Sequence, residues 1–306
     1  MQESRNYDYA VFWKFTTSGV VVWKELVCDQ DRQYGVFSRQ REESDGPKPY
    51  SGEITHHSKK RMRKAIELLL EISPLRKVTN PATNRPMNFR VAFQTLTLSA
   101  PQRDHTDEEI KSTLLRPFLR GMKKHGMHNY VWKAELQKNQ NIHFHILTDA
   151  FLPYWIIRDY WNKQQAKLGF LQEFFEKHGH RHPNSTDVHG ETKPQRIQAY
   201  MLKYMVKDNN ISKQTNILDP DQRKHKGKVW DCSANLKLKF ESAYFMNLDV
   251  LNSLKRLESN NRVRILESDF YSVYLFNPSL RKKFFGKEYL NDYNTYLDKV
   301  KTFHSG

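Results

Sequence analysis

Cysteine is scarce in this chain of 306 residues, which contains only Cys28 and Cys232. Two distant cysteines exclude a disulfide-rich scaffold and a cysteine-based zinc finger, and they favour a reducing compartment. No uncharged apolar run reaches the length of about 18 residues that a membrane-spanning helix needs. The N-terminus lacks the basic and then apolar pattern of a secretory signal. We therefore expect a cytoplasmic protein.

Acidic residues are also few, since 34 Asp and Glu face 50 Lys and Arg, which leaves a net charge of +16. Such an excess favours polyanionic partners, with nucleic acid as the first candidate and an anionic membrane surface as the competitor. The chain has no Gly-x-x-x-x-Gly-Lys-Ser/Thr pattern, so a fused helicase is not expected. Aromatic residues make up 13% of the chain, which is too many for a disordered one.

The order of expected elements between residues 90 and 190 is informative. Strands are predicted at residues 90–99, 129–137, 141–148 and 184–189, and helices at residues 106–125 and 154–178. Thr106 and Glu109 form a capping box for the first helix, Pro117 kinks or splits it, and Gly169 interrupts the second. The β-α-β-β-α-β order is typical of a ferredoxin-like, split βαβ sheet with one open face. We therefore expect an α+β fold with an antiparallel sheet flanked by helices.

The N-terminal region has its own pattern. Aromatic and β-branched residues at 8–15 and 19–27 predict a β-hairpin. Ser58 is the expected N-cap of a helix that Pro74 ends. The first turn of this helix, residues 59–64, is basic. It is either a solvated face or a contact for nucleic-acid phosphates.

The remaining segments complete the expected domain organisation. Residues 74–88, with three prolines, predict a linker, whereas Trp230 and Leu236 predict a segment that packs back on the main domain. Residues 240–306 are expected to be mostly helical. The domains are then an accessory segment at 1–85, a main domain at 86–240 and a C-terminal helical segment at 241–306.

Two histidines separated by one residue, His143 and His145, lie on an expected strand between apolar neighbours. Because strand side chains alternate, both histidines share a face, about 7 Å apart, where two imidazoles can converge on one metal ion. The alternative is a half-buried strand that carries two hydrogen-bonded histidines. The pair therefore becomes a metal-site hypothesis only with a third ligand.

Glu135 is the expected third ligand. If a loop of three residues joins the two strands, Gln137 pairs with Asn141 and Glu135 pairs with His143 on the same face. A loop of four residues would turn Glu135 to the other face. Two imidazoles and one carboxylate with open positions suit Mg²⁺ or Mn²⁺ bridging a phosphate. The alternative role of Glu135 is an exposed strand carboxylate paired with a lysine.

A helix expected from about residue 194 carries two phenols and two ammoniums on one face. At 100° per residue, they fall within an arc of about 100°, and apolar residues occupy the other side: Tyr200, Lys203, Tyr204 and Lys207. A phenol attacks phosphorus poorly unless its charge is stabilised and the phosphate is polarised, which lysines and a metal can do. The alternative is an ordinary amphipathic helix with solvated lysines.

Three motifs together resemble a known family. They are a strand motif at residues 93–99, the His143-Phe144-His145 motif, and the Tyr-x-x-x-Tyr segment that ends at Lys207. In this order they resemble the HUH endonuclease superfamily. Within it, they are similar to rolling-circle replication initiators (Rep) of the two-tyrosine type, such as microvirus gene A proteins and related phage or plasmid initiators. The resemblance covers roughly residues 90–240.

The resemblance implies a site-specific nickase and ligase of single-stranded DNA that forms a 5′-phosphotyrosine intermediate. His143 and His145 would then bind a divalent metal, Glu135 would complete the site, and His189 is a reserve ligand. Tyr204 would be the nucleophile and Tyr200 the alternate one, with Lys207 and Lys203 assisting at the phosphate. The implied partners are single-stranded and origin DNA, a separate helicase and host replication proteins, in a bacterial host cytoplasm.

Other assignments remain open on the sequence alone. Relaxases of the same superfamily commonly place the tyrosine before the histidines, and the single-strand transposases tend to be shorter with one tyrosine. Here the tyrosines follow the histidines, which favours an initiator. From a different class, a non-catalytic nucleic-acid-binding protein could keep the sheet and the charge without the reaction.

Overall fold

The structure is a computed structural model that describes residues 7–28, 54–80, 83–191, 225–268 and 271–303. Its fold is α+β with antiparallel sheets, as the pattern of elements predicted. The chain divides into two compact units. One draws on Met1–Asp45 and Leu238–Phe303, and the other on Gly46–Lys237. None of the helices that the structure describes is long and apolar enough to span a bilayer.

The first unit contains the predicted N-terminal hairpin within a five-stranded sheet. The strand order is β10-β1-β2-β12-β11, with β1 at Tyr7–Thr16, β2 at Gly19–Cys28, β10 at Tyr244–Phe245, β11 at Val263–Ser268 and β12 at Tyr271–Phe276. Gly19 lies at the hairpin turn with φ +156°, and a Cβ there would meet the carbonyl oxygen of Tyr274 at 1.8 Å. A glycine is therefore required where β12 passes the turn.

The prediction that residues 240–306 are mostly helical is wrong in part. Helices are present, at α7 (Leu248–Ser259), α8 (Arg281–Phe284) and α9 (Lys287–Thr302), with the short 3₁₀ turn η6 (Pro278–Leu280). Three strands accompany them, because β12 pairs with β2 and β10 pairs with β1. The two ends of the chain share one hydrophobic core, formed by Trp13, Phe15, Val20, Val250, Leu254, Leu257, Phe276, Phe285 and Tyr293. Long-range pairing thus decides the state of these strands.

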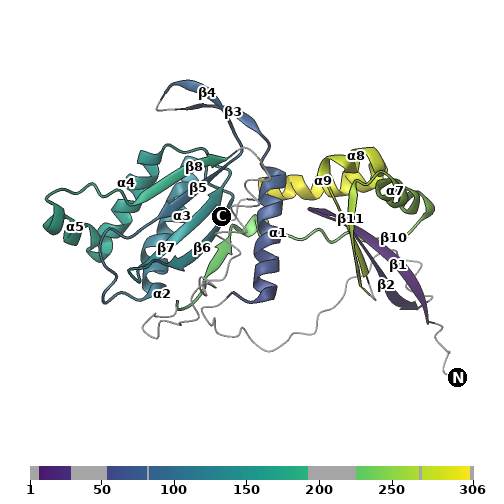
Figure 1. The fold of residues 1–306 in the computed structure, drawn as a ribbon, viewed down its shortest axis with the longest axis horizontal. Coiled ribbons are helices and arrows are strands. Elements are labelled where there is room, and N and C mark those ends of the chain that lie inside the picture. Colours follow the sequence, from purple (N-terminus) through teal and green to yellow (C-terminus); the bar gives the residue numbers. More distant parts are fainter. Residues whose placement is uncertain (1–6, 29–53, 81–82, 192–224, 269–270, 304–306) are drawn as a thin grey trace. The chain divides into compact units, whose positions relative to one another are not determined.

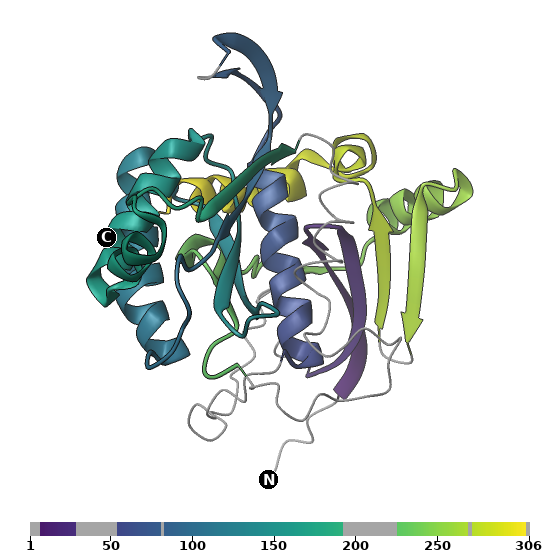
Figure 2. The ribbon, with the colours of Figure 1, turned by 60° about the vertical axis from the view of Figure 1, so that its left-hand side comes forward.

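Two further predictions need correction in the second unit. The expected linker at 74–88 is mostly a two-stranded ribbon of β3 (Arg76–Asn80) and β4 (Arg85–Phe89), seen projecting in Figures 1 and 2. Pro86 is tolerated there because each strand of a two-stranded ribbon is an edge strand. Cross-strand contact between Val78 and Met87 adds to the pairing.

The basic helix α1 spans His56–Ile72, so the predicted N-cap Ser58 is wrong. Thr55 is the N-cap, because its side chain accepts a hydrogen bond of 3.1 Å from the Ser58 backbone N–H. The Ser58 hydroxyl instead accepts from the Trp230 indole N–H at 2.5 Å. The predicted boundary between residues 85 and 86 does not coincide with the division into units, because α1 packs on β6 and β9 of the second unit.

The sheet of the second unit contains the predicted order of elements. Its strand order is β8-β5-β7-β6-β9 with all neighbours antiparallel: β5 at Val91–Leu96, β6 at Tyr130–Leu136, β7 at Ile142–Thr148, β8 at Thr186–Glu191 and β9 at Trp230–Cys232. β5 and β6 therefore run in the same direction with β7 between them. The Trp230 segment packs back as predicted, followed by the 3₁₀ turn η5 (Ala234–Lys237) in which Leu236 is buried.

Helices cover one face of this sheet (Figure 2). The first run comprises α2 (Asp107–Ile110), the π turn η2 (Lys111–Leu115), α3 (Arg116–Met122) and the 3₁₀ turn η3 (Lys123–His125). The second comprises α4 (Tyr154–Gln165), η4 (Ala166–Leu168) and α5 (Phe170–His178), interrupted at Gly169 as predicted. The Thr106 side chain caps the first run by accepting from the Glu109 N–H, also as predicted. These helices bury Trp132, Phe144 and Ile146, and α1 lies on the opposite face.

Candidate metal centre

The hairpin of β6 and β7 sets the register of the candidate site. Glu135 pairs with His143, and the Gln137 N–H donates to the Asn141 carbonyl at 2.9 Å. The loop therefore has three residues, 138–140, and its last residue Gln140 adopts φ +65°. This is the register that the sequence analysis required for a shared face. Side chains from β6 and β7 alternate, so the candidate ligands point away from the face that the helices α2 to α5 cover.

Glu135, His143 and His145 converge at one place on this open face. The Glu135 Oε2 atom lies 3.4 Å from His145 Nε2 and 3.7 Å from His143 Nε2. One ligand atom from each of the three residues lies within 4.8 Å of the others, so the cluster could hold a metal ion. The side chains are 22%, 15% and 11% exposed in the order 135, 143 and 145. The group is therefore half-buried yet open to solvent on one side.

Glu135 is held as a carboxylate by its surroundings. Burial by itself raises the pKa of the Glu135 carboxyl, but the two imidazoles and the Lys133 ammonium lower that pKa by more, to well below its usual range. Lys133 Nζ is fully buried beside the strand and donates to Glu135 Oε1 at 2.5 Å. One carboxylate oxygen thus pairs with Lys133, and the other faces the histidines. The two roles foreseen for Glu135, lysine pairing and metal binding, are geometrically compatible.

The ring nitrogens of His143 and His145 fit metal ligands. Both nitrogens of His143 are buried and have no hydrogen-bond partner among the residues that the structure describes. The 3.7 Å approach to Glu135 is longer than a hydrogen bond, and buried polar atoms are seldom left without a partner. His145 Nδ1 lies 3.3 Å from the Thr95 hydroxyl, so a proton on Nδ1 leaves the Nε2 lone pair directed toward Glu135. Two neutral nitrogens and one carboxylate oxygen form a reasonable donor set for a divalent ion.

His189, the reserve ligand, does not join this cluster. It lies on β8, where it pairs with Phe93 of β5. Its Nε2 atom is 2.7 Å from an Asp187 carboxylate oxygen, and both side chains are more than half exposed. His189 therefore forms an exposed ion pair at the sheet edge.

The predicted nucleophiles and their assisting lysines, Tyr200, Tyr204, Lys203 and Lys207, lie outside the described residues. The structure consequently leaves their positions relative to the cluster as a prediction.

Two residues of the site were missed by sequence reasoning. Lys133 precedes Glu135 by two residues and pairs with His145 in the register, and Thr95 pairs with His145 on the other side. The signal for Lys133 was present: a lysine two positions from a strand carboxylate shares its face, within the otherwise largely apolar stretch 131–136. Thr95 had no such local signal, because its place depends on which strand β7 pairs with.

Comparison with known proteins gives one match. Residues 91–209 match a family model whose description is replication-associated protein, of the ORF2 kind. No curated protein matches the chain, and no solved structure does. The matched region is less than half of the chain, and it contains β5, β6, β7, β8 and all three residues of the cluster. The match supports a replication initiator, and the site that it encloses could hold a divalent metal.

Proposed function

We propose that the chain initiates rolling-circle DNA replication as a metal-dependent, site-specific nickase and strand transferase of the HUH type. The observation that carries this proposal is the convergence of Glu135, His143 and His145 within the region that matches replication-associated proteins. The strand order β8-β5-β7-β6, with the histidines on the open face, supports a ferredoxin-like HUH core. Residues 86–240 would form the nuclease domain in this proposal.

The proposed nicking step is a phosphoryl transfer to tyrosine. The phenolic oxygen of Tyr204, which loses its proton, attacks the scissile phosphorus. The bond from phosphorus to the 3′ oxygen then breaks, and that oxygen takes up a proton. The enzyme becomes joined to the 5′ phosphate and the strand ends in a free 3′ hydroxyl. In strand transfer, a 3′ hydroxyl attacks the phosphotyrosine and releases the phenol. The number of phosphate ester bonds is unchanged, so rejoining needs no nucleotide cofactor.

The other residues have supporting roles in this reaction. Glu135, His143 and His145 would hold Mg²⁺ or Mn²⁺, which supplies Lewis-acid polarisation of the scissile phosphate. Lys133 would fix the Glu135 side chain through Oε1. Lys207 and Lys203 would stabilise charge on the phenolate and the phosphate oxygens. Tyr200 would make the second attack that ends a replication round.

The proposed partners follow from the charge and the reaction. A net charge of +16 suits a protein that holds single-stranded DNA together with origin DNA. Duplex unwinding would fall to a separate helicase, and elongation to host replication proteins in a bacterial cytoplasm.

A labelled single-stranded oligonucleotide tests the proposal directly. With Mn²⁺ and a panel of origin-like sequences, we expect a covalent protein–DNA adduct that is resistant to denaturation. Replacing both tyrosines (Tyr200→Phe with Tyr204→Phe) should abolish the adduct, because the attacking oxygen is removed, whereas at least one single variant should retain it. Tyr154→Phe, at an exposed tyrosine far along the sequence, is the matched control and should form the adduct normally.

The opposite outcome is equally clear. Tight binding across the panel without an adduct would contradict the nickase and favour the non-catalytic nucleic-acid-binding protein. An adduct that survives the double tyrosine replacement would place the nucleophile elsewhere.

A further inference from the structure

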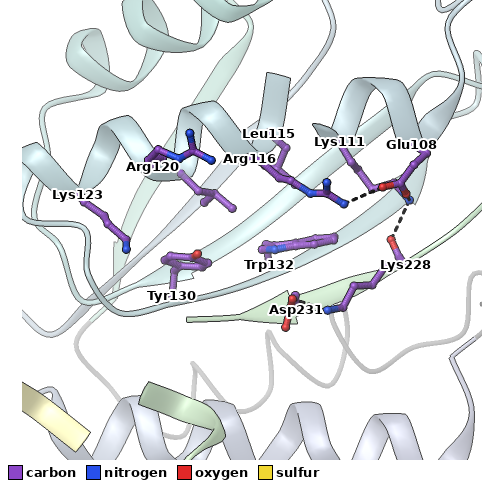
Figure 3. Close-up of a pocket in the computed structure, with 11 residues that line it drawn as sticks. Glu108, Lys111, Leu115, Arg116, Arg120, Lys123, Tyr130, Trp132, Lys228 and Asp231 are labelled. Carbon is purple, nitrogen blue, oxygen red and sulfur yellow. Dashed lines mark hydrogen bonds and ion pairs between the residues drawn. The ribbon is translucent and has the colours of Figure 1, made fainter. Parts of the chain in front are cut away.

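A pocket of about 340 Å³ lies on the other face of the sheet from the metal cluster, between α2, η2 and α3 on one side and β6 and β9 on the other (Figure 3). Tyr130 and Trp132 of β6 line it, and they alternate with Lys133 and Glu135 along the strand. Because alternate strand residues face opposite sides, the pocket and the cluster are separate sites. Its volume is within the range of small-molecule sites.

The lining is strongly basic. Two carboxylates, from Glu108 and Asp231, face five cationic side chains: Lys111, Arg116, Arg120, Lys123 and Lys228. Ion pairs inside and beside the pocket already neutralise both carboxylates. Glu108 pairs with Arg116 at 2.8 Å and with Lys111 at 3.3 Å, and Asp231 pairs with Lys228 and with Lys237. An excess of positive charge therefore remains for an anionic ligand.

That excess is concentrated along one helical face. Arg116, Arg120 and Lys123 are spaced by four and three residues, which puts them on the same side of the helix. Figure 3 shows Lys123 above Tyr130, and Arg116 above Trp132. Arg120 forms no ion pair with any residue in the described ranges. A guanidinium and an ammonium side by side are suited to a phosphate.

The backbone around the pocket is unusual in two places. The π turn η2 supplies Lys111 and Leu115 and directly precedes Pro117, which lacks the N–H that would bond to the Thr113 carbonyl in a regular helix. Such π turns occur often at functional sites. Gly227, with φ +75°, brings its loop so close that a Cβ would lie 2.9 Å from both Glu108 Oε2 and Lys111 Nζ. Lys111 Nζ also donates to the carbonyls of Lys226 and Lys228, so the wall is well ordered.

We propose that this pocket binds one nucleoside monophosphate unit, with its phosphate at Arg120 and Lys123 and its base against Tyr130 and Trp132. Cations account for the phosphate, and flat rings account for the base, since bases stack on aromatic side chains. Burial and then the charge of Asp231 raise the pKa of Tyr130 to about 12, so its hydroxyl remains a hydrogen-bond donor at neutral pH. The unit is either a free nucleotide or one position of a single strand. The proposal goes beyond the nicking reaction and does not depend on it.

Calorimetry on the full chain in EDTA tests the ligand class without any nicking. The probes are thymidine 5′-monophosphate, thymidine and inorganic phosphate. We expect the nucleotide to bind more tightly than either half alone. Equal binding of phosphate and nucleotide would overturn the proposal, because it would show a simple anion site.

Matched variants test the location. Arg120→Ala and Lys123→Ala should each weaken nucleotide binding by at least about fivefold, whereas Lys124→Ala, an exposed neighbour outside the pocket, should not. Tyr130→Phe should retain binding and Tyr130→Leu should lose at least about fivefold, because only the ring stacks. Unchanged affinity in Arg120→Ala and Tyr130→Leu would overturn the proposal, provided that circular dichroism shows folded variants.

A labelled oligo-dT distinguishes the two sources of the ligand. If the unit belongs to a strand, Arg120→Ala should reduce the salt dependence of oligo-dT binding by about one phosphate contact relative to Lys124→Ala. If the pocket takes free nucleotide, the oligo-dT curves of the two variants should coincide while nucleotide binding still differs. Coincident curves for both ligands would overturn the proposal.

Discussion

At the scale of single residues, the candidate metal centre depends on how Glu135 divides its two oxygens. Lys133 takes Oε1, and the two histidines face Oε2. Because Lys133 is fully buried, its ammonium needs a nearby anion, since an unpaired buried charge costs about 3–5 kcal/mol. Glu135 therefore contributes to stability as well as to the proposed metal site, and a test of one role must control for the other.

Replacing Glu135 by glutamine separates the two roles. Glu135→Gln keeps the size of the side chain and an oxygen near Lys133 but removes the negative charge that the ion needs. We expect Mn²⁺ affinity, measured by calorimetry, to fall by at least about tenfold. Glu176→Gln, at an exposed carboxylate on α5, is the matched control and should bind Mn²⁺ as the unmodified chain does.

The thermal midpoint in EDTA should accompany that measurement, because a folded Glu135→Gln chain is needed to interpret it. Undiminished Mn²⁺ binding in Glu135→Gln and in His143→Ala would show that the cluster does not hold the ion.

The residue scale also shows where sequence reasoning succeeds. The shared face of Glu135 and His143 follows from loop length and strand alternation, both of which are local, and the register agrees. Lys133 lay within the same local pattern and could have been included. Thr95 could not, because its contact with His145 depends on the pairing of strands about 50 residues apart in sequence.

At the scale of elements, α3 and α4 meet at a glycine. A Cβ on Gly121 would lie 1.8 Å from the Tyr160 hydroxyl oxygen and 2.1 Å from Tyr160 Cζ. Tyr160 of α4 therefore crosses α3 at the position where the side chain is smallest. Gly121 is not needed for its φ angle, so its role is close packing.

Gly121→Ala is expected to destabilise the protein despite a better helix propensity. Alanine gains about 1 kcal/mol over glycine in a helix interior, but overpacking costs about 1–3 kcal/mol and forces the Tyr160 ring to move. The midpoint of urea unfolding should fall for Gly121→Ala alone. In the background of Tyr160→Ala the same replacement should be neutral or stabilising. A drop of equal size in both backgrounds would show that Tyr160 is not the cause.

Elements were predictable where their signals were local. The capping box at Thr106, the interruption at Gly169 and the N-terminal hairpin all agree with the structure. The ribbon of β3 and β4 was missed because prolines were taken as evidence of a linker, although an edge strand tolerates Pro86. The N-cap of α1 was displaced by one turn, since both Thr55 and Ser58 are good caps and only geometry distinguishes them.

At the scale of the whole molecule, the first unit is built from both ends of the chain. Strands β1 and β2 contribute Trp13, Phe15 and Val20 to its core, and most other members come from residues 250–293. This arrangement escaped the sequence analysis, because the pairing of β12 with β2 joins segments about 250 residues apart. Local periodicity carries no information about such pairing.

Deleting residues 238–306 should therefore unfold the N-terminal hairpin. An isolated two-stranded hairpin is marginal in water, and its core partners would be gone. We expect hydrogen exchange to become fast at the amides of β1 and β2, whereas β6 and β7 should stay protected by their own core. The full chain is the reference. Slow exchange in β1 and β2 of the shortened chain would contradict the shared core.

The β6–β7 hairpin has one more consequence, which concerns the changes that the chain can tolerate. All candidate ligands lie within residues 135–145, on either side of the loop at 138–140. Any side chain compatible with the backbone can occupy that loop, Gln140 with its positive φ being the most restricted. A single-residue insertion or deletion there, however, would rotate Glu135 away from the histidines. Mutational drift at this tip is thus permitted in composition but not in length.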